Sequence, residues 1–129
     1  MKRVFLSYAY EDIQQVRGVK LLLANPNYDL DFYDESLGSA IDSQDANYIK
    51  SVIGDKIRRS SITVCLIGKD THKSSWVDWE LMKSDEEGNK IVAMALKGID
   101  SATLPALIKE KGLIFHGWSP KDLGDLIGE

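Results

Sequence analysis

The chain of 129 residues is 43% hydrophobic and 28% charged, which fits a globular domain with its own core and excludes a disordered tail or a fibre. Its 16 basic and 20 acidic residues give a formal net charge of -4, which argues against general electrostatic binding to nucleic acid or to an anionic membrane surface. We therefore predict a single domain over residues 1–129, with no nucleic-acid or membrane partner.

The first half of the chain alternates between predicted strands and helices. An apolar run at residues 4–6 predicts the first strand, and apolar side chains at helical spacing predict a helix over 13–23. Residues 28–33 alternate aromatic or apolar with acidic side chains, which is typical of a strand at the periphery of a sheet. Helical spacing returns over 49–57, and the continuous apolar run at 62–67 predicts a strand covered on both faces.

The second half continues the alternation. A helix is predicted from Trp76 with Ser75 as its N-cap, and Gly88–Asn89 predicts a left-handed turn that ends it. Residues 91–96 form another continuous apolar run, and residues 113–115 form a shorter fifth strand candidate. Strands that alternate with helices predict an α/β fold with a parallel sheet and right-handed crossovers.

In such a sheet the functional crevice lies at the carboxyl ends of the strands. The residues to inspect are those that follow Leu6, Tyr33, Ile67 and Leu96. The chain contains neither a GxGxxG nor a GxxxxGK[ST] sequence, so neither of these phosphate-binding loops is indicated.

Acidic side chains follow two of the predicted strands. Glu11 and Asp12 come after the strand at residues 4–6, and Asp70 follows the strand at 62–67. A receiver-like signalling domain holds Mg²⁺ with such carboxylates, so Mg²⁺ binding at these residues is one alternative. However, Asp70 lies beyond the strand end at which a receiver places its phosphorylated aspartate.

The stretch at residues 74–81 carries the strongest candidate. On a helix, residues four apart share a stripe, so Trp76, Glu80 and Ser84 line up, while Val77 and Leu81 are expected to pack on the sheet. Glu80 is then a carboxylate near a helix start, beside an indole, at the edge of the crevice. The alternative is that Glu80 is a solvated helix residue and that Trp76 anchors the core.

Three segments resemble the Toll/interleukin-1 receptor (TIR) domain family. Residues 3–8, Arg-Val-Phe-Leu-Ser-Tyr, look like its first box, and residues 57–64 are similar to the helix-to-strand passage of TIR chains. Residues 74–81 resemble the S-x-W-x-x-x-E-L helix of the family, and the three matches occur in the right order. Residues 88–91, Gly-Asn-Lys-Ile, look like the TIR-like domains of the Thoeris anti-phage system.

The resemblance implies a flavodoxin-like three-layer α/β sandwich around a five-stranded parallel sheet of order 2-1-3-4-5. It also implies cleavage of NAD⁺ at the nicotinamide–ribose bond, and Thoeris members cyclise ADP-ribose into a signal for a partner effector protein. The motif glutamate maps onto Glu80 as the catalytic residue, and Ser7 and Tyr8 map onto the edge that faces NAD⁺. Tyr8 or Trp76 is expected to stack on the nicotinamide or adenine ring. NAD⁺ is then the substrate, and no cofactor or metal is required.

Two loops depart from the TIR pattern. Residues 34–45 lack the Arg-Asp-x-x-Pro-Gly sequence of receptor TIR domains, where this loop mediates assembly, so a homo-oligomer through residues 34–45 and the helices is expected without a defined geometry. Gly68 stands where many relatives have serine. Because many TIR-like domains are scaffolds without activity, the alternative function is a non-enzymatic protein-interaction module.

The chain has one cysteine, Cys65, which excludes an intrachain disulfide and a cysteine-built zinc site. It lies in the apolar run at 62–67, where a buried and unreactive thiol is expected. No run approaches the ~20 apolar residues of a membrane span, and the apolar residues 4–6 are too few for a signal peptide. The sequence thus predicts a soluble, cytoplasmic domain.

Overall fold

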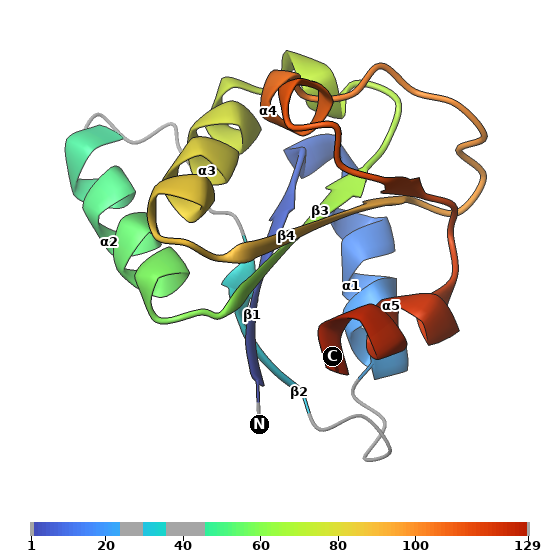
Figure 1. The fold of residues 1–129 in the computed structure, drawn as a ribbon, viewed down its shortest axis with the longest axis horizontal. Coiled ribbons are helices and arrows are strands. Elements are labelled where there is room, and N and C mark those ends of the chain that lie inside the picture. Colours follow the sequence, from blue (N-terminus) through green and yellow to red (C-terminus); the bar gives the residue numbers. More distant parts are fainter. Residues whose placement is uncertain (1, 24–29, 36–45, 129) are drawn as a thin grey trace.

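A parallel sheet of order β2-β1-β3-β4-β5 forms the centre of the molecule in the computed structural model, which describes residues 2–23, 30–35 and 46–128 (Figure 1). Each pair of neighbouring strands is parallel. The strands are β1 (Lys2–Tyr8), β2 (Leu30–Glu35), β3 (Ile62–Ile67), β4 (Lys90–Ala95) and β5 (Phe115–His116). The predicted α/β class with a parallel sheet is confirmed.

Helices cover both faces of this sheet, so the molecule has three layers (Figure 1). One face carries the helices α1 (Ile13–Leu23) and α5 (Pro120–Gly128). The other face carries α2 (Ala46–Arg58), α3 (Ser75–Glu86) and α4 (Ala106–Glu110). Short 3-10 turns, η1 (Tyr10–Asp12) and η2 (Thr71–Lys73), follow β1 and β3 at the carboxyl edge of the sheet.

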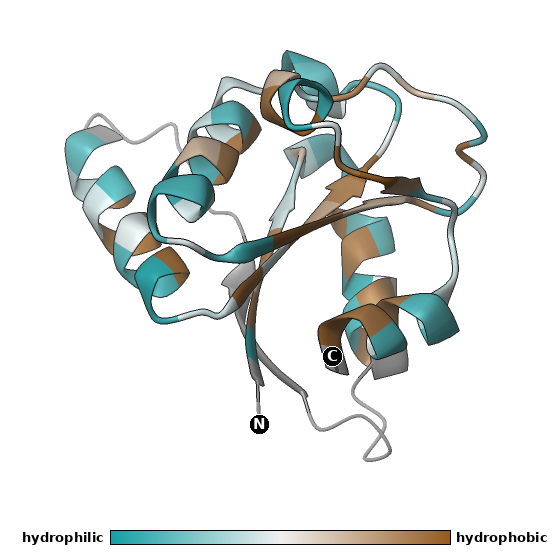
Figure 2. Cartoon of the chain, in the orientation of Figure 1, coloured by the Kyte–Doolittle hydropathy of each residue, from teal (hydrophilic) through white to brown (hydrophobic). Residues whose placement is uncertain are grey.

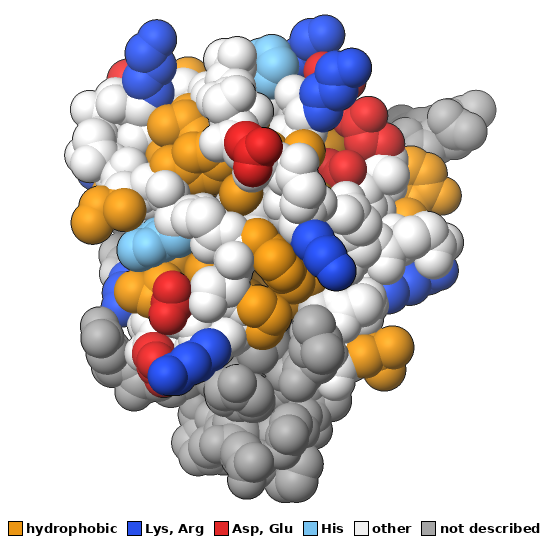
Figure 3. Space-filling view, turned by 90° about the vertical axis from the view of Figure 1, so that its right-hand side faces the viewer, with side chains coloured by type: hydrophobic (Ala, Val, Ile, Leu, Met, Phe, Trp, Pro, Cys, Tyr) orange, Lys and Arg blue, Asp and Glu red, His pale blue; other side chains and the backbone are white. Residues whose placement is uncertain are grey.

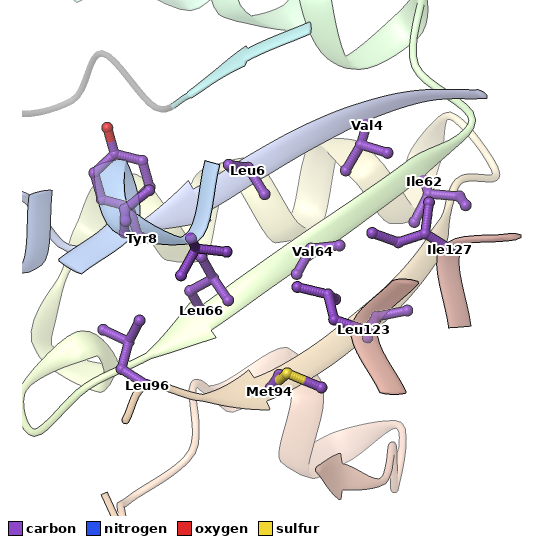
Figure 4. Close-up of a cluster of buried hydrophobic side chains, with 13 residues drawn as sticks. Val4, Leu6, Tyr8, Ile62, Val64, Leu66, Met94, Leu96, Leu123 and Ile127 are labelled. Carbon is purple, nitrogen blue, oxygen red and sulfur yellow. The ribbon is translucent and has the colours of Figure 1, made fainter. Parts of the chain in front are cut away.

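The strand period of two divides the side chains of β1 between the two faces. Val4, Leu6 and Tyr8 point toward α1 and α5, where they join the largest cluster of buried hydrophobic side chains (Figure 4). Phe5 therefore points the other way and packs with α2. Apolar residues also dominate β3 and β4, whereas hydrophilic residues lie along parts of the helices (Figure 2).

The helix α3 begins one residue earlier than the sequence suggests. Ser74, with extended backbone, is the N-cap, and its Oγ accepts a hydrogen bond from the Val77 amide at 3.2 Å. Ser75 is already helical, so the predicted cap at Ser75 is wrong by one position. Gly88 has a φ of 77°, which confirms the predicted left-handed turn beyond the helix end.

Some observed elements were not predicted, and one predicted feature lies outside the described residues. The helices α4 and α5 have no counterpart among the predicted elements. Residues 36–45, which include most of the predicted assembly loop, lie outside the described residues. Among the helices of the described segments, none has the length and apolar character that a membrane crossing needs.

Candidate functional site

The side chains of Ser7 and Glu80 meet beneath α3. The Ser7 Oγ donates a hydrogen bond of 2.8 Å to Oε1 of Glu80. Neither residue has any surface exposed to solvent. The structure thus brings together two of the residues that the TIR resemblance singles out, and the solvated alternative for Glu80 is wrong.

Local chain geometry explains why these two residues meet. Phe5 and Ser7 project from the same face of β1, and α3 packs over β1 and β3 on that face. After β3 the chain turns through η2, where the Gly68 amide donates to the Thr71 Oγ1 at 2.8 Å. It then returns across the sheet as α3, which brings Glu80 in the second helical turn over the end of β1.

Apolar residues of α3 lie next to the stripe that carries Glu80. Val77 and Leu81, on the adjacent stripe of α3, are fully buried against the sheet as predicted. Burial raises the pKa of the nearby Cys65 thiol, and the negative charges of Glu80 and Asp78 add to that rise. The Cys65 thiol is therefore protonated and unreactive.

Further hydrogen bonds continue from Glu80 toward the other end of α3. The Ser84 Oγ donates to the backbone carbonyl of Glu80 at 2.8 Å and lies 2.7 Å from the Thr63 Oγ1. The Asn89 Nδ2 lies 3.4 Å from the same Thr63 oxygen and donates to the Ile57 carbonyl at 3.0 Å. We call the side chains of Ser7, Thr63, Glu80, Ser84 and Asn89 the polar seam.

Sequence reasoning found only part of the polar seam. It placed Ser84 on the stripe of Glu80 but gave it no role, and it did not single out Thr63. The available signal was that Thr63 is the polar residue of an otherwise apolar strand. A buried hydroxyl in such a run needs a partner, and Ser84 supplies it.

Trp76 lies one turn before Glu80, in contact with a second tryptophan. The rings of Trp76 and Trp79 meet edge to face, with 6.2 Å between their centroids. The Lys50 Nζ lies 5.9 Å from the Trp76 ring centroid and 5.6 Å from that of Trp79. Both rings thus receive a cation–π contact from α2, and both pack, partly buried, against the cluster of Phe5, Ile53 and Ile57.

Tyr8 lies on the other face of the sheet. It follows Ser7 directly, so its side chain projects toward α1, where it is almost wholly buried with Val4 and Leu6 (Figure 4). The structure therefore joins Ser7 to Glu80 but does not bring Tyr8 to them.

The carboxylates considered for Mg²⁺ gather at the carboxyl edge. Burial raises the pKa of Asp12 above its ordinary value, and the negative charges of Glu11 and Asp70 raise it further. Within the described parts of the chain, no group of three or more His, Cys, Asp or Glu residues is arranged to hold a metal ion. The Mg²⁺-binding alternative therefore gains no support from this structure.

A groove of about 370 Å³ lies on the α1 side of the sheet. Its walls are mainly apolar, and hydrophobic side chains gather near the centre of this side of the molecule (Figure 3). Its lining residues are Gln15, Gly18, Val19, Leu96, Lys97 and Trp118. Because the sheet separates it from Glu80, this groove is not part of the candidate site.

Sequence comparison agrees with the motifs. Residues 5–101, which include Ser7 and Glu80, match the family described as Thoeris protein ThsB, TIR-like domain. The chain is 33% identical over 98 residues to the Bacillus cereus (strain MSX-D12) protein named "Putative cyclic ADP-D-ribose synthase ThsB1". The match covers 72% of this chain and 50% of that protein, so the chain spans about half the length of this relative.

Two solved structures resemble the fold. The TIR domain of the Toll-related receptor TRR-2 from Hydra magnipapillata has a TM-score of 0.64 and 19% identity, over 99% of this chain and 93% of that one. The Clostridium botulinum CMP N-glycosidase BcmB has a TM-score of 0.62 and 15% identity, over 99% of this chain and 100% of that one. At these identities the likeness establishes the fold alone.

Proposed function

The chain belongs to the Thoeris ThsB TIR-like domain family, and from that premise we propose that it binds NAD⁺ and cleaves the nicotinamide–ribose bond with Glu80 as the catalytic residue. The single observation that carries this proposal is the fully buried Glu80 carboxylate, held by the Ser7 hydroxyl at 2.8 Å. A side chain buried at such cost and oriented by a specific donor is typical of a functional carboxylate.

The chemistry of the bond favours a buried carboxylate. Departure of neutral nicotinamide from NAD⁺ leaves an oxocarbenium-like ribose, so positive charge develops at the sugar. A carboxylate in apolar surroundings stabilises that charge more strongly than water does, and it does so mainly in the transition state. Glycoside hydrolysis uses carboxylates for the same purpose.

The proposal includes the contacts of the substrate. We assign Ser7 and Trp76 to the NAD⁺ site, with Trp76 as the ring that stacks on a base. Trp76 is one helical turn from Glu80, and Ser7 bonds to Glu80 directly. Tyr8, which the TIR resemblance also places at the NAD⁺ edge, is not included, because its side chain is buried on the other face of the sheet.

The product and the partners are further parts of the proposal. The name of the Bacillus cereus relative, which refers to cyclic ADP-D-ribose synthesis, supports a cyclic ADP-ribose signal as the product. We propose that an effector protein reads this signal in the cytoplasm, and that copies of the chain associate through residues 34–45 and the helices. The strand order β2-β1-β3-β4-β5 supports a five-stranded, flavodoxin-like form of the TIR fold.

The test is nicotinamide release by the purified chain at high protein concentration, with products separated by chromatography. We expect release by wild type and none above background by Glu80→Gln. Glu86→Gln is the matched control, because Glu86 lies on the same helix with an exposed side chain that lies 4.0 Å from Lys83. It should release nicotinamide at the wild-type rate.

The same experiment distinguishes an enzyme from the alternative function, a non-enzymatic interaction module. If wild type releases no nicotinamide, and millimolar NAD⁺ leaves its NMR spectrum unchanged, the enzyme proposal is rejected in favour of a non-enzymatic interaction module. If nicotinamide is released, the second product distinguishes ADP-ribose from its cyclic form.

A further inference from the structure

We propose that Thr63, Ser84 and Asn89 are positioning residues. They fix α3 at the position along the strands of the sheet where the Glu80 carboxylate meets Ser7. This inference rests on the proposed NAD⁺ cleavage by Glu80. None of the three touches the Glu80 carboxylate in the hydrogen bonds described above; they act through the backbone of Glu80 and the placement of its helix.

Counting hydroxyl protons gives the seam a direction. Ser84 has one hydroxyl proton, which it donates to the Glu80 carbonyl. In its 2.7 Å contact with Thr63, Ser84 must therefore accept, and Thr63 must donate. Thr63 in turn accepts from Asn89, whose second amide proton goes to the Ile57 carbonyl. The bonds thus run in one direction, from Asn89 through Thr63 and Ser84 to Glu80.

The distance between Glu80 and Ser84 along α3 matches the distance along the strands between their partners, Ser7 and Thr63. Glu80 and Ser84 are separated by four helical residues, about 6 Å along α3. In the sheet, Thr63 pairs with Phe5, two residues before Ser7, which is about 6.6 Å along the strand. Because a crossover helix runs antiparallel to its strands, Glu80 reaches Ser7 on β1 when Ser84 reaches Thr63 on β3.

Polar contacts fix this register better than apolar packing does. Apolar contacts are non-directional, so α3 could shift along the sheet at modest cost if Val77 and Leu81 alone held it. A shift would leave the hydroxyls of Thr63 and Ser84 buried without partners, because both are fully enclosed. The buried hydroxyls of Thr63 and Ser84 both have partners in the observed register, and buried polar contacts of this kind favour one arrangement, which here sets the position of Glu80.

The experiment compares Thr63→Val, Thr63→Ser and Ser60→Ala in steady-state NAD⁺ cleavage. Valine has the shape of threonine without its hydroxyl, whereas serine keeps the hydroxyl. Ser60 is the control for the loss of a hydroxyl bond outside the seam. Its Oγ donates to the carbonyl four residues earlier, that of Lys56 at 2.8 Å, as the Ser84 Oγ donates to that of Glu80. We expect kcat to fall about 10- to 100-fold in Thr63→Val with KM changed less than about twofold, as misplacement of a catalytic group predicts.

Recovery of most of the wild-type kcat by Thr63→Ser, and an unchanged kcat in Ser60→Ala, would support the proposal. An equal kcat in Thr63→Val and Ser60→Ala, with wild type active, would overturn it. Asn89→Ala, which removes the first donor of the seam, provides the same comparison if Thr63→Val does not fold.

A second readout keeps this inference separate from the proposed function. The ¹³C chemical shift of the Glu80 carboxyl group is recorded in each variant without NAD⁺. We expect it to change in Thr63→Val and to stay constant in Ser60→Ala. A constant shift in both variants would overturn the positioning role, whereas an inactive wild type with the expected shift change would reject only the NAD⁺-cleaving function.

Discussion

The Ser7 Oγ and the Glu80 Oε1, which belong to residues 73 positions apart in the chain, lie 2.8 Å from each other in the interior of the protein. The bond joins β1 to α3, and both side chains are closed to solvent. A hydroxyl that donates to a carboxylate makes a charge-assisted hydrogen bond, stronger than one between neutral groups. Ser7 therefore orients the carboxylate on which the proposed chemistry depends.

Replacement of Ser7 by alanine should affect catalysis more than binding. Ser7→Ala removes the donor to Glu80, so we expect kcat for NAD⁺ to fall roughly tenfold or more with a smaller change in KM. Loss of a buried bond to a carboxylate should also lower the free energy of unfolding by about 1–3 kcal/mol. Steady-state kinetics and urea unfolding, with Ser60→Ala as the control, check both effects. A rise in KM without a fall in kcat would contradict the orienting role of Ser7 and leave only its proposed contact with NAD⁺.

The parts of the fold that sequence predicts best are those where one local signal dominates. The apolar run of β3 coincides with the observed Ile62–Ile67, because a strand covered on both faces is largely apolar. The helix α5 has no predicted counterpart, because Gly124 lies inside it and lowers its helical propensity. Its place depends on Leu123 and Ile127, which are buried against distant strands that no local pattern reveals.

The sequence indicates some of the residues of the candidate site but not which of them are hydrogen-bonded to one another. The TIR motif drew attention to Glu80, and the helical stripe drew attention to Ser84. Which hydroxyl reaches which partner depends on the register between α3 and two strands, and this register arises only from the assembled sheet. Tyr8 is next to Ser7 in the sequence but does not share its site, because successive residues of a strand point to opposite faces of the sheet.

A side chain at Gly68 should displace the carboxylate of Asp12. A Cβ atom at Gly68 would lie 2.8 Å from Cγ and 2.9 Å from Oδ1 of Asp12, distances that force the carboxylate to move. We expect Gly68→Ala to lower the free energy of unfolding by about 1 kcal/mol or less, because the atoms in its way are the end of the Asp12 side chain, which can rotate aside. In an Asp12→Ala background the same change should cost little, and urea unfolding of the four proteins measures this coupling. Equal costs in both backgrounds would contradict the proposed clash.

The charge of Asp12 should destabilise the protein at neutral pH. Burial, then Glu11 and Asp70, raise its pKa in the folded state above the ordinary value of 3.8. A raised acid pKa favours folding while the group is protonated, and that contribution is lost as pH rises through the folded-state pKa.

Asp12→Asn, which stays neutral, should therefore be more stable than wild type at neutral pH by about 0.5 kcal/mol, a figure reduced for solvent screening. The difference should shrink as pH falls below the folded-state pKa of Asp12. Thermal unfolding at several pH values measures it, with Asp100→Asn at an exposed position as the control. A difference that grows toward low pH would have the wrong sign.

Lys50 should contribute through its charge to the packing of α2 against α3. Its ammonium lies within 6 Å of two tryptophan ring centroids, those of Trp76 and Trp79. Lys50→Met keeps the apolar stem and removes the charge, so we expect a loss of about 0.5–1 kcal/mol in the free energy of unfolding. Urea unfolding monitored by tryptophan fluorescence measures it, and Lys109→Met on the exposed side of α4 should leave stability unchanged.

The most direct measurement is the rate of nicotinamide release from NAD⁺ that is bound to the protein, compared between wild type and Glu80→Gln. NMR titration first establishes the NAD⁺ concentration that saturates each protein, so that binding and chemistry are separated. We expect both proteins to bind NAD⁺ and Glu80→Gln to release nicotinamide at least about 100-fold more slowly, because the loss falls on transition-state charge. Equal rates of release from the two saturated proteins would contradict the catalytic role of Glu80.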